Sequence, residues 1–340
     1  MSTKAVIFGC AGTQLGAAER EFFARTDPAG FILFARNVES PAQLRALTGA
    51  LRDAVGRAAP VLVDQEGGRV QRLKPPHWRA APPPGRFGEL AARDPAGAEL
   101  AVRLNARLIG AELAAVGIDT VCAPSLDLRI PGAHQVIGDR AFSADPAVVA
   151  ALGRAACEGF FTAGVTPVIK HMPGHGRSQV DSHLHLPVVD APLAELEASD
   201  FRPFRELADM PLGMTGHLLI RAVDAERPAT ISSRVISEVI RGHIGFEGVL
   251  ISDDLSMEAL AGSVQARAAA AIGAGCDIAL HCNGKLAEME AIAEALPALA
   301  PAVATRLAAA RLLAAGGAPA GDGDAAELLQ RLDQLLAGAA

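Results

Sequence analysis

Residues 248–253 read GVLISD, a short aliphatic run that ends in an aspartate. Residues 166–171 (TPVIKH) and 212–217 (LGMTGH) follow the same pattern, with apolar residues first and a histidine last. Short apolar runs without polar alternation are typical of parallel strands that are buried on both faces. The pattern therefore predicts a parallel sheet with polar residues at the carboxyl ends of its strands.

Longer segments rich in Ala, Leu, Arg and Glu separate these runs. Residues 41–55 and 95–116 are two examples, and their apolar residues recur with helical periodicity. Eight strand–helix alternations in one chain of 340 residues predict a single closed (β/α)₈ barrel, an α/β fold of the TIM type. The other five expected strands are AVIFG (5–9), GFILFA (30–35), APVLVD (59–64), TVCAPS (120–125) and DIALHC (277–282).

The domain organisation that we expect is one catalytic barrel over residues 1–315 and a helical tail over residues 316–340. The tail begins with GGAPAGDGD (316–324), a composition typical of a flexible break. The segment AAELLQRLDQLL (325–336) follows and has the pattern of an amphipathic helix that packs on the barrel or on a partner subunit. Residues 74–91 are rich in proline, so we expect a stiff, projecting loop there.

The composition indicates which kinds of partner, compartment and ligand suit this protein. The net charge of −7 comes without a basic stripe, which argues against nucleic acid as a partner. Apolar stretches are interrupted before they reach membrane-spanning length, and the five cysteines are scattered without a CxxC pair, so we expect a cytoplasmic protein with free thiols. The chain has one tryptophan and no tyrosine, which favours a small polar ligand over a long polysaccharide.

Polar residues gather at the ends of the predicted strands. Because the carboxyl ends of barrel strands form the catalytic face, several such residues in register predict an active site. They are Asp64, Asp127, His171, His217, Asp253 and His281.

The pair Asp253 and Asp254 has two interpretations. Aspartate commonly caps a helix N-terminus, and a helix is expected to start near Ser256. Alternatively, one carboxylate attacks a substrate while the other holds backbone or a cation. Neighbouring side chains on a strand point to opposite sides, so only one of the two can face the barrel axis.

The loop after the fifth strand carries Asp181 and His183, two residues apart. In an extended segment this spacing lets the carboxylate bond the imidazole, fix its tautomer and raise its basicity. Such a pair suits general acid–base catalysis. Together with His171, His175 and His185 this pair also admits a metal site, although no HxH motif follows the first strand and the HLH at 183–185 lies in a loop.

The segment VDQEGGRVQRL (63–73) places Asp64 at a strand end and Arg72 shortly after it. Asp64 could accept hydrogen bonds from paired sugar hydroxyls, and Arg72 could hold an acetamido, carboxylate or phosphate oxygen. A structural ion pair between the two is the alternative.

Taken together, these segments resemble the bacterial β-N-acetylglucosaminidases of glycoside hydrolase family 3, the single-domain kind that acts in cell-wall recycling. The resemblance runs nearly end to end, and its most specific part is the pairing of a KHxPGHG…DSH loop with SDDLSM. The matching segments are GFILFARNVESPAQL, VLVDQEGGRVQRL, VIGDRAF, VIKHMPGHGRSQVDSHLHLPVV, RPATISSRVI and GVLISDDLSMEAL.

The resemblance implies a retaining exo-glycosidase with small amino-sugar substrates derived from peptidoglycan. Asp253 is then the nucleophile, and His183, held by Asp181, is the general acid/base. The sugar-binding residues that the resemblance implies are Asp64, Arg72, Arg140, Lys170 and His171. No metal or organic cofactor is expected, and the protein is expected to be a monomer or a weak dimer.

Alternatives follow from the same residues. A metal-dependent hydrolase would be inhibited by chelators. A sugar sensor would bind its ligand without turnover, and this binding would persist in Asp253→Ala. An imidazole base tolerates an anionic acceptor, so phosphate stays open beside water. The loop 172–187 must close for turnover if it carries the acid/base, and its resting position and the aglycone are left open.

Overall fold

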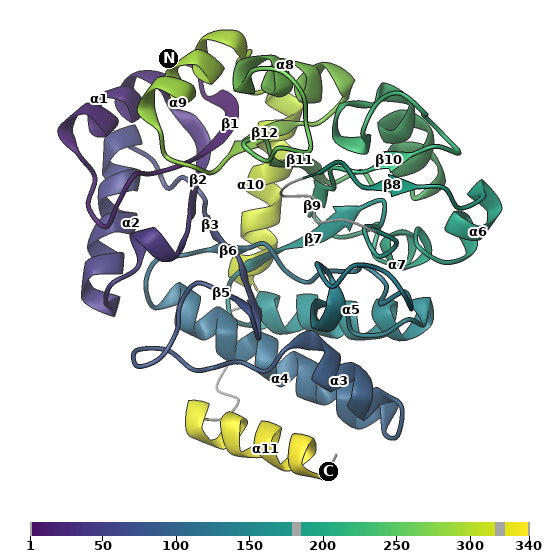
Figure 1. Ribbon diagram of the computed structural model, residues 1–340. Coiled ribbons are helices and arrows are strands. Elements are labelled where there is room, and N and C mark those ends of the chain that lie inside the picture. Colours follow the sequence, from purple (N-terminus) through teal and green to yellow (C-terminus); the bar gives the residue numbers. More distant parts are fainter. Residues whose placement is uncertain (1, 179–184, 317–323, 339–340) are drawn as a thin grey trace.

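The computed structural model describes residues 2–178, 185–316 and 324–338. Its centre is a closed barrel of parallel strands in the order β1-β12-β11-β9-β7-β6-β3-β2 (Figure 1). The eight strands are β1 (Lys4–Gly9), β2 (Pro28–Leu33), β3 (Val61–Val63), β6 (Thr120–Val121), β7 (Thr166–Met172), β9 (Leu212–Thr215), β11 (Val249–Asp254) and β12 (Ile278–His281). Each strand lies within or overlaps one predicted run, so the predicted (β/α)₈ barrel is confirmed.

The barrel closes between the first and last strands. Val6, Ile7 and Phe8 of β1 pair in parallel with Ala279, Leu280 and His281 of β12. Two small sheets lie outside the barrel. One joins β4 (Gln65–Gly67) and β5 (Val70–Gln71) in antiparallel fashion, and the other joins β8 (Val188–Val189) and β10 (Leu219–Ile220).

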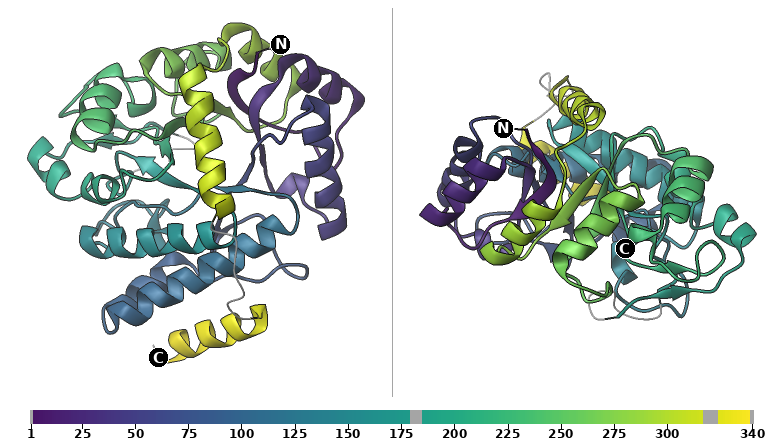
Figure 2. Two further views of the ribbon diagram at one scale, coloured as in Figure 1. Left: turned by 180° about the vertical axis from the view of Figure 1, so that it is seen from behind. Right: turned by 90° about the horizontal axis from the view of Figure 1, so that it is seen from above.

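Helices surround the barrel, and α10 crosses its rear face (Figure 2). Their bounds are α1 (Ala17–Thr26), α2 (Pro41–Val55), α3 (Pro84–Ala91), α4 (Pro95–Ala114), α5 (Pro146–Thr162), α6 (Leu193–Ala198), α7 (Arg202–Glu206), α8 (Val264–Ala274), α9 (Leu286–Ala295), α10 (Pro301–Gly316) and α11 (Ala325–Ala337). A π-helix, η4, spans Val235–His243, and three 3₁₀ turns are η1 (Ala35–Asn37), η2 (Gly138–Arg140) and η3 (Ala229–Ile231).

Three of these helices begin in the same way, with a capping side chain followed by proline. Ser40, Asp94 and Asp145 each accept a hydrogen bond from a backbone N–H in the first turn of α2, α4 and α5. Proline occupies the next position in each helix, where the missing N–H is not needed. These local signals explain why the predicted start of α2 and α4 coincides with the observed one.

The core has two layers that follow the alternation along each strand. In β11, Val249 and Ile251 point into the barrel interior, whereas Leu250 packs against the surrounding helices. Asp253 lies two residues after Ile251 and faces the cavity above this core. Asp254 borders the cavity as well, because the register between β11 and β12 shifts between Ile251 and Asp254. The strand that fills the core thus also brings both carboxylates to the cavity.

One expectation about the fold is wrong in part. Residues 74–83 do form a loop, exposed over 74–77, but Pro84–Ala91 fold as helix α3 and pack against α4. Trp78, in the same segment, is buried. Proline at the first positions of α3 is compatible with helix, so a proline-rich composition here marks a helix start.

The C-terminal helix α11 lies beside α4 and α3, away from the strands (Figure 1). Leu332 on α11 is fully buried, and Leu328, Leu329, Leu335 and Leu336 pack partly against the same core. The predicted boundary at residue 315 stays a prediction, since residues 317–323 lie outside the described part. In the described ranges, we find no helix with the length and apolar character that crossing a bilayer requires.

Candidate active site

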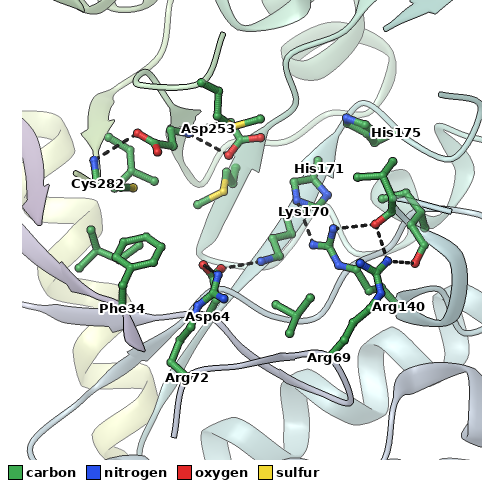
Figure 3. A pocket seen from close by; sticks show the side chains of 18 of the residues that line it. Phe34, Asp64, Arg69, Arg72, Arg140, Lys170, His171, His175, Asp253 and Cys282 are labelled. Carbon is green, nitrogen blue, oxygen red and sulfur yellow. Dashed lines mark hydrogen bonds and ion pairs between the residues drawn. The ribbon is translucent and has the colours of Figure 1, made fainter. Parts of the chain in front are cut away.

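A cavity of about 530 Å³ opens at the carboxyl ends of the barrel strands (Figure 3). Its size is that of a site for a small ligand, and charged groups converge on it from several strands. Six of the predicted site residues line it: Asp64, Arg72, Arg140, Lys170, His171 and Asp253. The other two, Asp181 and His183, lie outside the described residues.

Asp253 faces this cavity from the end of β11. Its Oδ1 accepts a hydrogen bond of 2.8 Å from the backbone N–H of Asp254. Among the described residues, no Arg or Lys forms an ion pair with its carboxylate. Burial raises the pKa of Asp253, but His217, His171, the Asp254 amide and Lys170 outweigh this effect and hold it below the usual value. The carboxylate is therefore ionised and faces the space where a substrate would lie.

Asp254 holds a turn. The helix expected near Ser256 is absent, because α8 begins only at Val264, so Asp254 does not cap a helix there. Its carboxylate accepts hydrogen bonds from the Ser256 N–H at 3.0 Å and the Ser256 hydroxyl at 2.6 Å. It also accepts one from the Cys282 N–H at 3.2 Å, across to the end of β12. Asp254 thus fixes the turn after β11. The Asp253 carboxylate faces the cavity with a single hydrogen-bond donor among the described residues, the Asp254 N–H.

The floor of the cavity is an ion-pair network. The buried Lys170 ammonium lies 2.8 Å from Asp64 Oδ1 and 2.8 Å from Glu66 Oε1. Arg72 Nη2 donates to Asp64 Oδ2 at 3.0 Å, and its guanidinium lies over the Phe34 ring. Burial raises the pKa of Asp64, but Lys170 and Arg72 lower it to about 2. For Lys170, burial lowers the pKa, and the two carboxylates more than reverse this.

Glu66 joins this network to Arg140. Its two carboxylate oxygens accept from Arg140 Nε at 2.8 Å and Nη2 at 2.7 Å, a bidentate pair. Burial would raise the pKa of Glu66, but Arg140 and Lys170 bring it far below its usual range. Its side chain is only 1% exposed, so Glu66 acts by orienting the two cations.

His171 is held from behind by a buried carboxylate. Its Nδ1 lies 2.6 Å from Asp127 Oδ2, and a carboxylate can only accept there, so Nδ1 carries the proton. In the neutral ring, Nε2 then has its lone pair free, and Arg140 Nη2 lies 3.5 Å from it. The other Asp127 oxygen accepts the His175 backbone N–H at 2.7 Å. This arrangement fixes the tautomer of His171.

His175 packs beside His171, with ring centroids 5.7 Å apart, and both rings border the cavity. Burial and the neighbouring His171 lower the pKa of His175 to about 4, so its ring is neutral near pH 7. His185 is exposed, so the histidines grouped in the sequence do not all converge in space. Within the described ranges, no three His, Cys, Asp or Glu side chains group as metal ligands.

The comparisons with known proteins agree with this geometry. The family model described as "Glycosyl hydrolase family 3 N terminal domain" matches residues 6–314. The chain belongs to glycoside hydrolase family 3.

Two relatives of the chain in this family are named β-hexosaminidase. A β-hexosaminidase of Bordetella avium is 43% identical over 282 residues, covering 82% of this chain and 80% of that one. A β-hexosaminidase of Xanthomonas campestris pv. campestris is 40% identical over 301 residues, covering 87% and 88%. The crystal structure of NagZ from Neisseria gonorrhoeae, in complex with N-trifluoroacetyl-D-glucosamine, superposes with a TM-score of 0.87 at 31% identity, covering 100% and 99%.

This family 3 chain is thus a glycoside hydrolase of the β-N-acetylhexosaminidase type, in the single-domain form that NagZ represents. The sequence prediction of the family and of the enzyme class is confirmed.

Sequence reasoning about this family 3 site did not identify Glu66, and it did not identify His171 as the partner of Asp127. Glu66 lies two residues after Asp64, and this spacing on an extended segment is the signal that could have identified it. Asp127 was placed at a strand end, but its bond to His171 depends on the neighbouring strands β6 and β7. The ion pair of Asp64 with Arg72 is present, yet both side chains also line the cavity.

Proposed function

We propose that this family 3 hydrolase is a retaining exo-β-N-acetylglucosaminidase that acts on small muropeptide fragments of peptidoglycan in cell-wall recycling. The observation that carries the proposal is the Asp253 carboxylate, ionised and facing the cavity without an Arg or Lys ion pair among the described residues. The N-trifluoroacetyl-D-glucosamine bound by the Neisseria structure supports an N-acylated amino sugar as the ligand class.

The sugar would be gripped by the network on the cavity floor. Asp64 offers carboxylate oxygens for sugar hydroxyls, and Lys170 and Arg72 donate beside it. Arg140 and His171 lie next to each other and would take a further hydroxyl or the acetamido oxygen. Because these groups are already paired and oriented, little ordering is left to occur when the sugar binds.

The reaction would proceed by double displacement. Asp253 attacks the anomeric carbon while protonated His183, oriented by Asp181, gives its proton to the leaving glycosidic oxygen. A glycosyl ester forms on Asp253. Neutral His183 then removes a proton from the incoming water, which attacks the same carbon and releases the ester, and the sugar leaves with its original configuration.

The proposal extends to the cofactors, cellular compartment and oligomeric state of the enzyme. The hydrolysis needs no metal or organic cofactor, because a carboxylate and an imidazole carry every bond change. We propose a cytoplasmic enzyme that is a monomer or a weak dimer, with no nucleic acid or membrane as partner. Its free, buried cysteines accord with a reducing compartment.

The test is release of 4-nitrophenol from its N-acetyl-β-glucosaminide in EDTA, for wild type, Asp253→Ala and His183→Ala. We expect metal-independent turnover in wild type and a loss of at least about 10³-fold in Asp253→Ala. Azide should rescue that variant as the α-glycosyl azide, because the anion takes the place of the missing carboxylate. His183→Ala should retain the initial burst of 2,4-dinitrophenol from its glycoside, whose leaving group needs no proton. Its steady-state turnover should be slow, because hydrolysis of the glycosyl ester lacks the base.

Two outcomes would contradict the proposal. Loss of wild-type turnover in EDTA would point to a metallohydrolase. Sugar binding that survives Asp253→Ala, without turnover in wild type, would identify a sensor.

A further inference from the structure

A chain of buried hydrogen bonds lies behind the carboxylate that we propose as the nucleophile. Thr215 ends β9, His217 follows it, and Thr230 belongs to η3. All three side chains are 0% exposed, and none of them lines the cavity. They meet through Thr230, whose hydroxyl lies 2.8 Å from the Thr215 hydroxyl and 2.8 Å from His217 Nδ1.

This chain begins and ends on the backbone around Asp253. The Asp253 N–H donates to the Thr215 hydroxyl at 3.3 Å. At the other end, His217 Nε2 lies 3.0 Å from the carbonyl oxygen of Asp254. A carbonyl can only accept, so Nε2 carries the proton and, in the neutral ring, Nδ1 accepts from the Thr230 hydroxyl. The Thr215 hydroxyl in turn donates to Thr230.

With a neutral His217 ring, the bonds run from the Asp253 N–H through the two threonine hydroxyls to His217 and from there to the Asp254 carbonyl. The Thr230 hydroxyl also lies 3.2 Å from the Gly216 carbonyl oxygen, a second acceptor. Thr230 joins Thr215 to His217, so a change in Thr230 affects both ends. The backbone of Thr230 is held as well, because its carbonyl oxygen accepts a hydrogen bond from the Cys276 thiol.

We propose that Thr230, with Thr215 and His217, is a positioning residue that holds the backbone of Asp253 so that its carboxylate meets the anomeric carbon. The inference rests on the proposed function, since it presupposes that Asp253 attacks. Among the described residues, the carboxylate itself has one hydrogen-bond donor, the Asp254 N–H, so its direction depends on where the backbone of residues 253 and 254 lies. A misplacement of about 1 Å in a reacting group can cost about 10²-fold in rate.

The experiment compares Thr230→Val, which keeps the shape and removes the hydroxyl, with Thr230→Ser, which keeps the hydroxyl. Thr166→Val is the matched control, because the Thr166 hydroxyl is buried on β7 and has no hydrogen-bond partner in the described part of the chain. Pre-steady-state release of 2,4-dinitrophenol from its N-acetyl-β-glucosaminide reports the attack step. We expect Thr230→Val to slow it by about 10- to 100-fold with KM within about 3-fold of wild type.

Thr230→Ser should recover the attack rate to within about 3-fold of wild type, and Thr166→Val should not change it. Thr215→Val breaks the same chain at its other member and should give the same loss, which keeps the test decisive if Thr230→Val does not fold. Equal losses in Thr230→Val and Thr230→Ser would overturn the inference, because shape and not the hydroxyl would then matter. An unchanged attack rate in folded Thr230→Val or Thr215→Val would overturn it as well.

Covalent labelling separates this failure from failure of the proposed function. The probe is a 5-fluoro N-acetylglucosaminyl fluoride, which slows hydrolysis of the glycosyl ester and lets it accumulate. Label on Asp253 in wild type, formed at the same rate in Thr230→Val, would refute only the positioning role. Label on another residue, or none, would refute the nucleophile assignment on which the inference rests.

Discussion

Glu66→Gln tests how far the cavity floor depends on a single buried carboxylate. The substitution keeps the shape of the side chain and removes its charge. In wild type, Glu66 accepts two hydrogen bonds from Arg140 and lies 2.8 Å from the Lys170 ammonium. The amide nitrogen of glutamine is a donor, so at least one of these cations would face another donor in a buried place.

The expected loss of stability can be worked out from these contacts. Removing one partner of a buried ion pair costs about 3 to 5 kcal/mol, because the remaining charge is left without compensation. Lys170 keeps Asp64 as a partner, so we expect the lower end, about 3 kcal/mol. With a urea m-value of about 3 kcal/mol/M, the unfolding midpoint would fall by about 1 M.

The pH dependence gives a second, independent signature. The pKa of Glu66 is lower in the folded protein than the unfolded value of about 4.3. A depressed carboxyl pKa contributes stability that is complete above the unfolded value and is lost as the pH falls toward the folded one. The gap between wild type and Glu66→Gln should therefore stay constant from pH 7 to about 5 and narrow below about pH 4.3.

The assay is urea unfolding at pH 7, 5 and 3.5, together with KM for the 4-nitrophenyl substrate, which should rise because Lys170 and Arg140 lose their orientation. Glu158→Gln is the matched control, since Glu158 pairs with Arg103 on the surface with side chains 47% and 42% exposed. That variant should lose less than about 1 kcal/mol. Equal shifts in the two variants, or a gap that does not narrow in acid, would refute the reasoning.

Two further predictions concern stability. His175 is buried with a pKa of about 4, below its unfolded value of about 6.5, so between these values the unfolded chain binds the extra proton. The stability of wild type should therefore rise from pH 4 to 6.5. Urea unfolding of His175→Asn across that range should show a weaker rise, and an unchanged slope would contradict this. Leu332→Ala on α11 should lower the free energy of unfolding by about 2 to 5 kcal/mol, whereas Leu312→Ala, at a side chain that is 73% exposed, should lower it by less than about 0.5 kcal/mol; similar values in urea unfolding would show that α11 does not dock as described.

The barrel was predictable because its signal is local. Each strand is a short aliphatic run, and each of the observed barrel strands overlaps one of these runs. The alternation in β11 also indicated that only one of Asp253 and Asp254 could face inward. The sequence of the strand could not decide which of the two aspartates faces inward. That depends on the register with β12, where Asp254 accepts a hydrogen bond from the Cys282 N–H.

The sequence predicted the residues that line the cavity, but not the contacts of the buried residues that orient them. Asp64, Lys170 and Asp253 follow strands, so their position at the mouth of the barrel comes from the fold itself. Glu66 and Asp127 act through contacts to residues 74 and 44 positions away in the chain. Helix α3 was not predicted because a proline-rich segment was interpreted as a loop, although its prolines lie at the helix start, where they are tolerated.

The carboxylates around this cavity differ in their partners more than in their chemistry. Glu66 is held by two cations, Asp127 by an imidazole and a backbone N–H, and Asp254 by a turn. Each of these charges is already compensated in the free protein, so each is more useful for holding a neighbour than for attacking a carbon. Asp253 differs from them because it faces the cavity with one hydrogen-bond donor among the described residues, the Asp254 N–H. In the reaction that we propose, its negative charge would stabilise the positive charge that develops on the sugar ring in the transition state.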